Sequence, residues 1–143
     1  MLPASAVSAE FEGLDGRVWT FGLIADGSGG LLGRLTGWRD VSGRGASLAY
    51  DDTGGAGPLV VAIPGMGDLR SEYRALRPAL QQAGYRVVTM DVRGHGDSSA
   101  QWSDHSARAV GRDALALIEH LGAGPAFILG NSFAAGSALW AAH

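Results

Sequence analysis

The chain has 143 residues, of which 46% are hydrophobic and only 17% charged, a composition typical of one small globular domain. Its formal net charge of −3 gives no basic face and argues against a nucleic-acid partner. Lysine and cysteine are both missing, which excludes a Schiff-base lysine, a P-loop, a thiol nucleophile and a thiolate zinc site.

The N-terminal stretch MLPASAVSAEFEG lacks both the charged region and the long apolar run of a secretory signal. No run of residues approaches the 18 apolar positions that a membrane-spanning helix needs, so we expect a cytoplasmic protein without a membrane partner. The four histidines form no H-E-x-x-H pair. We therefore expect no metal site and no cofactor.

Residues 1–45 are rich in glycine and carry no recognisable motif. Residues 17–25 (RVWTFGLIA) are a candidate strand, and residues 26–37 (DGSGGLLGRLTG) have the composition of a loop. We interpret residues 1–45 as an N-terminal extension of unknown role, which could be a hairpin, a flexible segment or sequence upstream of the true start. The domain itself is predicted to cover residues 46–143.

From residue 46 the pattern becomes regular. Residues 46–52 (ASLAYDD) alternate as an edge strand does, and residues 59–63 (LVVAI) form an apolar run that suits a strand covered on both faces. An amphipathic helix follows from about residue 69, with Pro78 predicted at the first position of its regular part and Gly84 at its end.

The second half repeats this alternation. Residues 85–91 (YRVVTMD) and 126–130 (AFILG) are predicted to be buried strands. Between them, residues 106–122 have one apolar stripe and a glycine at the C-cap position, which predicts a helix. Strands that alternate with helices indicate an α/β fold with a mostly parallel sheet, flanking helices and right-handed crossovers.

In such a sheet, ligands bind at the carboxyl ends of the strands, where the chain carries three glycine-bearing loops. The last loop, GNSFA, is typical of a nucleophile elbow, which places a serine in a turn so tight that the residues two before and two after it must be small. Here the serine is Ser132, and the small residues are Gly130 and Ala134. A simpler interpretation of Ser132 is a helix N-cap.

Three motifs together resemble the α/β-hydrolase superfamily: IPGMGD at 63–68, DVRGHGDSS at 91–99 and LGNSFAAG at 129–136. The resemblance covers residues 46–143 and corresponds to the N-terminal half of that fold, cut after the helix of the elbow begins. It implies that Ser132 is the nucleophile of an acyl-enzyme mechanism. It also implies an oxyanion hole made by the backbone N–H groups of Met66 and Phe133.

The same resemblance assigns structural roles to the second loop. Asp91 and Arg93 are expected to fix that loop by hydrogen bonds, and His95 is expected to lie in a structural turn and not to act as a base. Members of the family carry the triad in the order serine, acid, histidine. Only 11 residues follow Ser132, with no carboxylate, and His143 is about three turns along the helix and directed away.

We therefore predict that the triad acid and base are absent from this chain and that the chain is a truncated product, inactive or weakly active as written. The predicted strand at 126–130 would then be a sheet edge, open to association with another chain.

The function that the resemblance implies is a serine hydrolase acting on an ester or related acyl bond of a small molecule. The alternatives are a carbon–carbon bond hydrolase of the ring-cleavage type, a cofactor-free haloperoxidase or lactonase, and a non-catalytic remnant or half-domain that needs a partner chain. Epoxide hydrolases and haloalkane dehalogenases carry aspartate at the elbow, so the serine at position 132 disfavours both.

Overall fold

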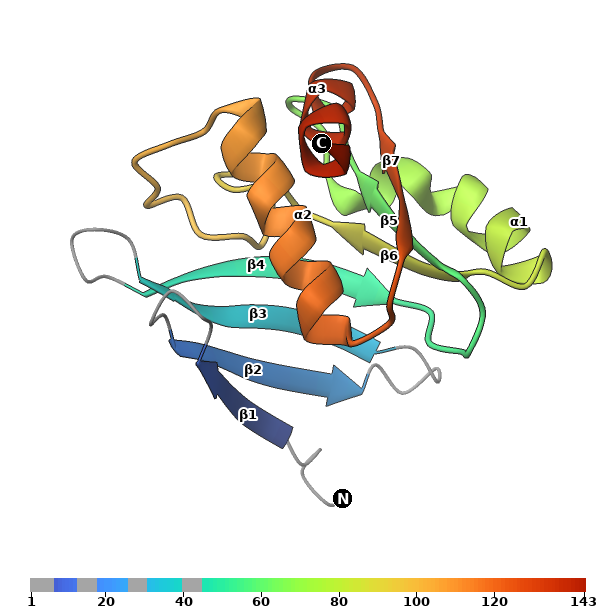
Figure 1. The fold of residues 1–143 in the computed structure, drawn as a ribbon, viewed down its shortest axis with the longest axis horizontal. Helices are drawn as coiled ribbons and strands as arrows, with labels where there is room; N and C mark the ends of the chain where they lie inside the picture. The colour runs from blue at the N-terminus through green and yellow to red at the C-terminus, as the bar shows by residue number, and fades with distance from the viewer. Residues whose placement is uncertain (1–6, 13–17, 26–30, 40–44) are drawn as a thin grey trace.

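The computed structural model describes residues 7–12, 18–25, 31–39 and 45–143, with the backbone alone described up to residue 45. The strands in these ranges form one mixed sheet in the order β1-β2-β3-β4-β6-β5-β7 (Figure 1). Their bounds are β1 Val7–Glu12, β2 Val18–Ala25, β3 Leu31–Arg39, β4 Gly45–Asp52, β5 Leu59–Ile63, β6 Arg86–Met90 and β7 Ala126–Gly130.

The N-terminal part of the sheet differs from the sequence prediction. The loop predicted at 26–37 is wrong from residue 31 onward, because β3 lies there. It pairs with β2 over residues 31–36 and with β4 over residues 31–39, with a register shift between Thr36 and Trp38. For the same reason β4 is an inner strand and not an edge, with β3 on one side and β6 on the other. Pairing with two neighbours outweighs the weak preference of glycine against strands. Residues 26–30 lie outside the described residues.

These antiparallel strands join β4 directly, so the sheet continues across the domain boundary predicted at residue 45. The predicted strand at 17–25 corresponds to β2, which begins at Val18. Whether residues 1–45 are an extension or part of the domain stays a prediction.

The parallel part of the sheet confirms the predicted alternation of strands and helices. β5 lies between β6 and β7 and runs parallel to both. All five residues of β5 are buried, as its continuous apolar run predicts. β7 is only partly buried, contrary to the buried strand predicted there, and Phe127 is 61% exposed. The reason is its place at the end of the sheet, with a described neighbour on one side alone.

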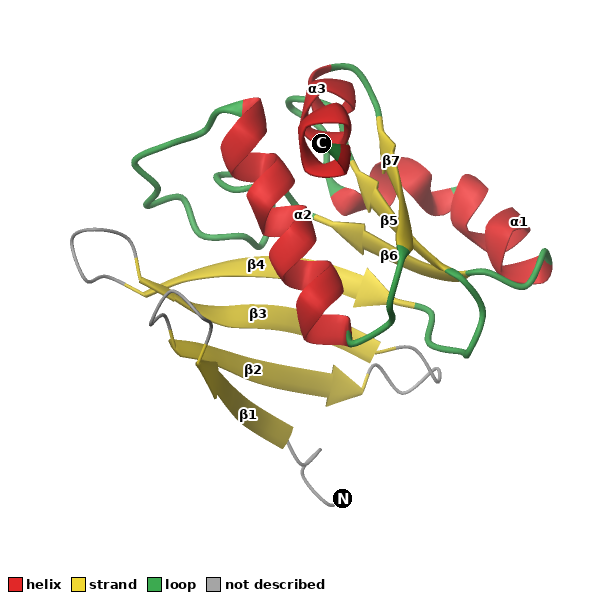
Figure 2. Ribbon diagram, viewed as in Figure 1, coloured by secondary structure: helices red, strands yellow, loops and turns green. Residues whose placement is uncertain are grey.

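Helices lie on both sides of the sheet (Figure 2), with α2 and α3 towards the viewer and α1 behind. Pro78 is the third residue of α1 and not the first, because the helix begins at Leu76 after a 3-10 turn. Proline is tolerated there since the amides of the first turn have no partner within the helix. The bounds are η1 Arg70–Arg74, α1 Leu76–Gln82, α2 Ala107–Leu121 and α3 Phe133–Ala142.

Helix α2 has the ends that its sequence predicts. Ser106 is the N-cap and its side chain accepts a hydrogen bond from the amide of Ala109, at 3.2 Å. Gly122 ends the helix in the left-handed conformation, with φ of 58°. Its apolar stripe enters the core through Val110, Ala114 and Leu117, all at most 1% exposed. The helix is therefore held mainly by burial of one face.

Within the described part of the chain, no helix combines the length and the apolar character that crossing a membrane requires.

Replacement of Leu117 by alanine tests this core. The side chain is fully buried among residues of α2, β5 and β6, so Leu117→Ala is expected to lower the free energy of unfolding by about 2–5 kcal/mol, measured by urea denaturation. Leu115, on the same helix and 40% exposed, is the matched control. Equal losses for Leu117→Ala and Leu115→Ala would contradict the assignment of the buried face.

Candidate active site

Two loops that follow neighbouring parallel strands come into contact beyond the end of the sheet. The loop after β5 begins at Pro64, and the turn after β7 contains Asn131 and Ser132. A Cβ atom placed on Gly65 would lie 3.7 Å from Ser132 Cβ and 3.4 Å from Asn131 Nδ2. The first and third of the predicted loops are thus brought together at the place where α/β sheets bind ligands.

The turn at Ser132 has an unusual backbone. Its φ is 54° and its ψ is −119°, and it is the one non-glycine residue with positive φ among those the structure describes. Such a conformation costs on the order of 1–3 kcal/mol for a residue with a side chain. The side chain makes no capping hydrogen bond to α3. The N-cap interpretation therefore does not explain the serine, since the stabilising contact of a cap is not made.

The small residues on either side of the turn are required by its geometry. A Cβ on Gly130 would lie 2.5 Å from the carbonyl carbon of Ala134 and 2.9 Å from the amide nitrogen of Ala135, and closer still to the Ala134 oxygen. Ala134 is fully buried beneath the turn. Position 130 therefore accepts no side chain, whereas the methyl group at position 134 fits.

The groups predicted to form the site make no hydrogen bond to any described residue. Ser132 is exposed, and its hydroxyl has no such partner. The backbone amides of Met66 and Phe133 have none either, and the Met66 side chain is 67% exposed while Phe133 is half-buried. The role of both amides in an oxyanion hole stays a prediction.

A residue that the sequence analysis did not single out connects the two loops. Glu72, on η1, accepts a hydrogen bond from the amide of Gly65 at 2.8 Å through one carboxylate oxygen. Through the other it accepts one from Asn131 Nδ2 at 2.6 Å. The next residue, Tyr73, donates its hydroxyl proton to the carbonyl of Ile63 at 2.9 Å. Burial, followed by the charge of Glu72, raises the pKa of Tyr73 to about 12 and keeps this donor protonated.

His95 connects the first loop to the second. Its Nε2 accepts a hydrogen bond from the amide of Gly67 at 3.1 Å, and its Nδ1 lies 3.2 Å from the carbonyl oxygen of Arg93. These contacts place the proton on Nδ1 and agree with the structural turn predicted for His95. With Nε2 already occupied, this histidine is poorly suited to deprotonate a serine.

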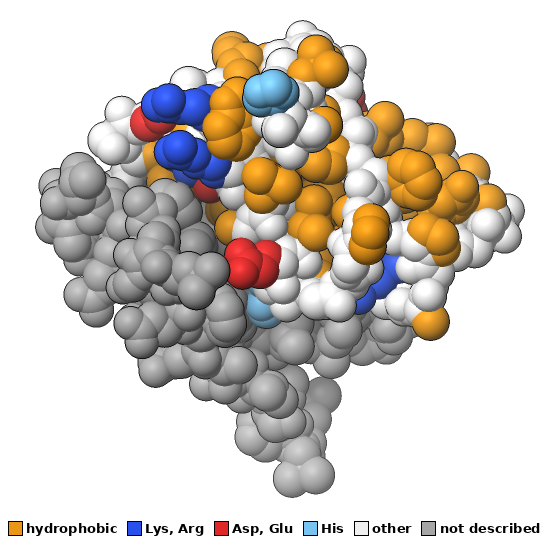
Figure 3. All heavy atoms as spheres, viewed as in Figure 1, with side chains coloured by type: hydrophobic (Ala, Val, Ile, Leu, Met, Phe, Trp, Pro, Cys, Tyr) orange, Lys and Arg blue, Asp and Glu red, His pale blue; other side chains and the backbone are white. Residues whose placement is uncertain are grey.

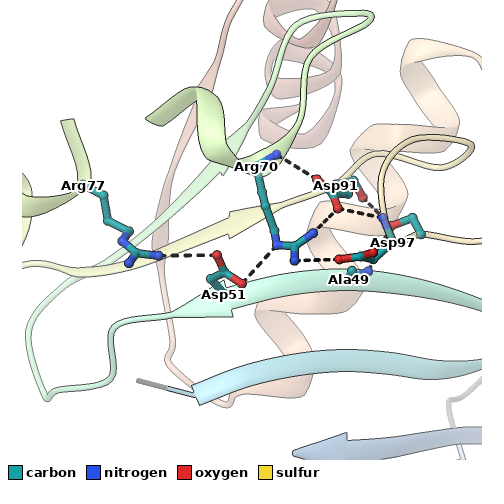
Figure 4. A network of polar contacts seen from close by, with 7 residues as sticks. Ala49, Asp51, Arg70, Arg77, Asp91 and Asp97 are labelled. Atoms are coloured by element: carbon teal, nitrogen blue, oxygen red, sulfur yellow. Dashed lines mark hydrogen bonds and ion pairs between the residues drawn. The ribbon is translucent and has the colours of Figure 1, made fainter. Parts of the chain in front are cut away.

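Arg70 links the loops to the sheet beneath them (Figure 4). Its guanidinium contacts the carboxylates of Asp51, Asp91 and Asp97, at 3.0 Å for Asp51 and 2.8 Å for Asp97. Burial alone would lower the pKa of Arg70, but the hydrogen bond to Asp97 and the charge of Asp91 outweigh it and raise this pKa. Asp91 also accepts a hydrogen bond from the amide of Asp97, at 3.1 Å. The loop-fixing role predicted for Asp91 agrees with these contacts.

Arg93 has a comparable function on the other side of the second loop. Its guanidinium forms a buried pair of hydrogen bonds with the carboxylate of Asp113 on α2, at 2.7 and 2.5 Å. It also donates to the carbonyl of Asp104 at 2.6 Å and lies 4.1 Å from the ring centroid of Trp102. This cluster holds residues 91–104 against α2, and removal of either partner would leave a buried charge without compensation.

The one histidine that follows Ser132 in the sequence lies far along α3. His143 is the last residue, at the C-cap of α3, and about 15 Å of helix separates it from Ser132. Among the described residues there is also no group of three histidine, cysteine, aspartate or glutamate side chains that could hold a metal ion. The predicted absence of the triad acid and base from this chain stays a prediction.

The alpha/beta hydrolase fold family matches residues 58–143, which is more than half of the chain and contains both loops of the site, so the protein belongs to this family.

Individual relatives are similar over part of the chain. Epoxide hydrolase B of Mycobacterium tuberculosis is 39% identical over 55% of this chain and 23% of its own length. An sn-1-specific diacylglycerol lipase of Mus musculus is 32% identical over 57% of this chain and 27% of its own length. Among solved structures, a thermophilic esterase from Thermogutta terrifontis superposes with a TM-score of 0.67 at 28% identity, over 76% of this chain and 40% of its own.

Gly130→Ala tests the geometry of the turn. The added methyl group overlaps the backbone of α3, so the substitution is expected to lower the free energy of unfolding by at least about 1–3 kcal/mol in urea denaturation.

The matched control is Gly136→Ala in the same helix, where the nearest atom to the new methyl group is the Ala107 Cβ at 3.7 Å. That variant is expected to be as stable as the wild type or more stable, because alanine favours a helix over glycine by about 1 kcal/mol. If Gly130→Ala were equally well tolerated, the tight turn would not exist in solution.

Proposed function

We propose that the protein is a serine hydrolase that acts on a carboxylic ester or a related acyl bond of a small molecule, with Ser132 as its nucleophile. The observation that carries this proposal is the backbone of Ser132. A serine held at positive φ on an exposed turn between a parallel strand and a helix, without a capping bond, is the arrangement of a nucleophile elbow. Backbone strain of this kind is retained where function needs it.

In the proposed reaction, Ser132 Oγ attacks the carbonyl carbon of the substrate and loses its proton to a base. The carbonyl oxygen becomes an oxyanion that accepts hydrogen bonds from the amides of Met66 and Phe133. Such donors lower the barrier because they are already oriented when the charge develops, and each is worth roughly 3–4 kcal/mol. The alcohol then departs with a proton, and water hydrolyses the acyl-enzyme to release the acid.

The serine also supports one of the activities named for the relatives over another. Several relatives are named epoxide hydrolases, and one is named a lipase. A serine that opened an epoxide would form an ether, which water does not cleave under mild conditions. A serine that attacks an ester forms another ester, which water can hydrolyse. The nucleophile at position 132 therefore supports acyl chemistry over epoxide opening.

The acid and the base are proposed to lie outside these 143 residues. The chain spans only 23% of the length of the epoxide hydrolase and 27% of the length of the lipase. β7 is at the end of the described sheet, and apolar side chains gather on the surface beside it and over α1 (Figure 3). Phe127 on β7 and Leu76 on α1 are among the exposed large apolar residues. We propose that the remaining part of the site joins along this edge.

The remaining part could belong to the same polypeptide or to a second chain. The intact mass of the protein in its own host separates the two: a mass near 14.7 kDa would favour a second chain, and a much larger mass would favour the same one.

Covalent labelling tests the proposed nucleophile. A fluorophosphonate probe is expected to attach to the protein at one site per chain, because phosphorus takes the place of the acyl carbon and fluoride leaves. Ser132→Ala should abolish the adduct, as judged by intact mass spectrometry and peptide mapping.

Ser103→Ala is the matched control, since Ser103 is also exposed but lies in the loop before α2. It should label like the wild type. A folded native protein, isolated from its own host together with the part that supplies the base, that never labels would contradict the proposal. So would a Ser132→Ala variant that labels equally well.

A further inference from the structure

We propose that Glu72 is a positioning residue that sets the distance between the two halves of the oxyanion hole, an inference that rests on the proposed hydrolase function. The predicted donors, Met66 and Phe133, belong to different loops. Each donor lies close in sequence to a residue that donates a hydrogen bond to Glu72. Gly65 directly precedes Met66, and Asn131 lies two residues before Phe133.

The sheet itself does not fix this distance. The parallel pairing of β5 with β7 ends at Ile63 and Gly130. One step further, the amide of Asn131 lies 3.4 Å from the carbonyl of Ile63, a long hydrogen bond. Beyond that point, the carboxylate of Glu72 accepts one hydrogen bond from each loop and so connects them.

Glu72 is itself held in place by contacts of η1 with the preceding loop and with the end of β5. Its amide donates to the carbonyl of Leu69 at 2.8 Å, which fixes the start of η1. The adjacent Tyr73 is only 7% exposed and is anchored to the carbonyl of Ile63, the last residue of β5. The carboxylate is thus attached to the same strand end whose loop it connects to the elbow. A small movement of either loop would stretch one of its two hydrogen bonds.

The chemistry of the bridge distinguishes three side chains. A carboxylate has two acceptor oxygens and can serve both donors at once. Glutamine can also make both bonds, because its oxygen accepts from Gly65 while its amide group donates to Asn131 after the Asn131 amide has turned over. Methionine has a similar length but no effective acceptor, so it makes neither bond.

The experiment measures the kinetics of fluorophosphonate labelling and separates probe affinity (KI) from the rate constant of bond formation (kinact). Glu72→Met is expected to lower kinact at least about tenfold with KI changed less than about threefold, because loosely held donors stabilise the transition state poorly while probe binding is unaffected. The loss should stay below the roughly 10²–10³-fold of removing a donor altogether. Glu72→Gln should recover most of the rate constant.

Glu119→Gln is the matched control, because Glu119 is exposed on α2 and remote from both loops. It should label at the wild-type rate. Wild-type kinact in a folded Glu72→Met protein would overturn the proposal, as would a Glu72→Gln variant no better than Glu72→Met.

A variant at the other end of the bridge controls for a folding defect at position 72. Asn131 is exposed, so Asn131→Ala should leave the free energy of unfolding nearly unchanged while it removes the second hydrogen bond of Glu72. Asn131→Ala is expected to lower kinact about as much as Glu72→Met. The double variant, Glu72→Met with Asn131→Ala, should be no slower than either single variant. Losses that multiply in the double variant would contradict a shared bridge.

Hydrogen exchange of the Gly65 amide tests the bridge without any reaction. This amide should exchange at least about tenfold faster in Glu72→Met than in the wild type, because its acceptor is gone. Unchanged exchange would overturn the bridge itself. Faster exchange in Glu72→Met, combined with a native wild-type protein that never labels, would instead uphold the bridge and contradict the proposed hydrolase.

Discussion

The close approach of Gly130 to the backbone of Ala134 is the constraint on which the proposed site depends. It allows the chain to turn from β7 into α3 within two residues, and the turn forces Ser132 into a left-handed backbone conformation. That conformation leaves the hydroxyl exposed at the end of the sheet and leaves the amide of Phe133 without a partner in the described chain. A looser turn would let the serine relax into an ordinary helix cap.

Much of the polar structure around the turn holds loops in place. Arg70 spans three aspartates, Arg93 forms a buried pair with Asp113, and His95 and Glu72 connect one loop to the next. Hydrogen bonds of this kind each contribute only modestly to stability, and their larger effect is to give the loops one arrangement. Such fixed arrangements matter for a reaction whose barrier depends on donors placed to within a fraction of an ångström.

The sequence predicted the parallel half of the fold and the tight turn at Ser132 well, because these depend on strong local signals. The apolar run at 59–63 and the helix from Ser106 to Gly122 are examples, and the turn was predicted from the small residues on either side of Ser132. The role of Ser132 as a nucleophile stays a prediction. The sequence misled where pairing between strands decides the outcome: the glycine at 33 indicates a loop, yet it lies in β3 and pairs with both β2 and β4. It could not identify Glu72, since its two partners are 7 and 59 residues away and come close only after folding.

The measurement that tests the central claim most directly is a crystal structure of the protein after reaction with a fluorophosphonate. The account predicts phosphorus bound to Ser132 Oγ, a positive φ at that residue, and the phosphoryl oxygen about 2.7–3.1 Å from the amide nitrogens of both Met66 and Phe133. An adduct whose phosphoryl oxygen points into solvent, or a serine that has relaxed to helical φ, would contradict the account.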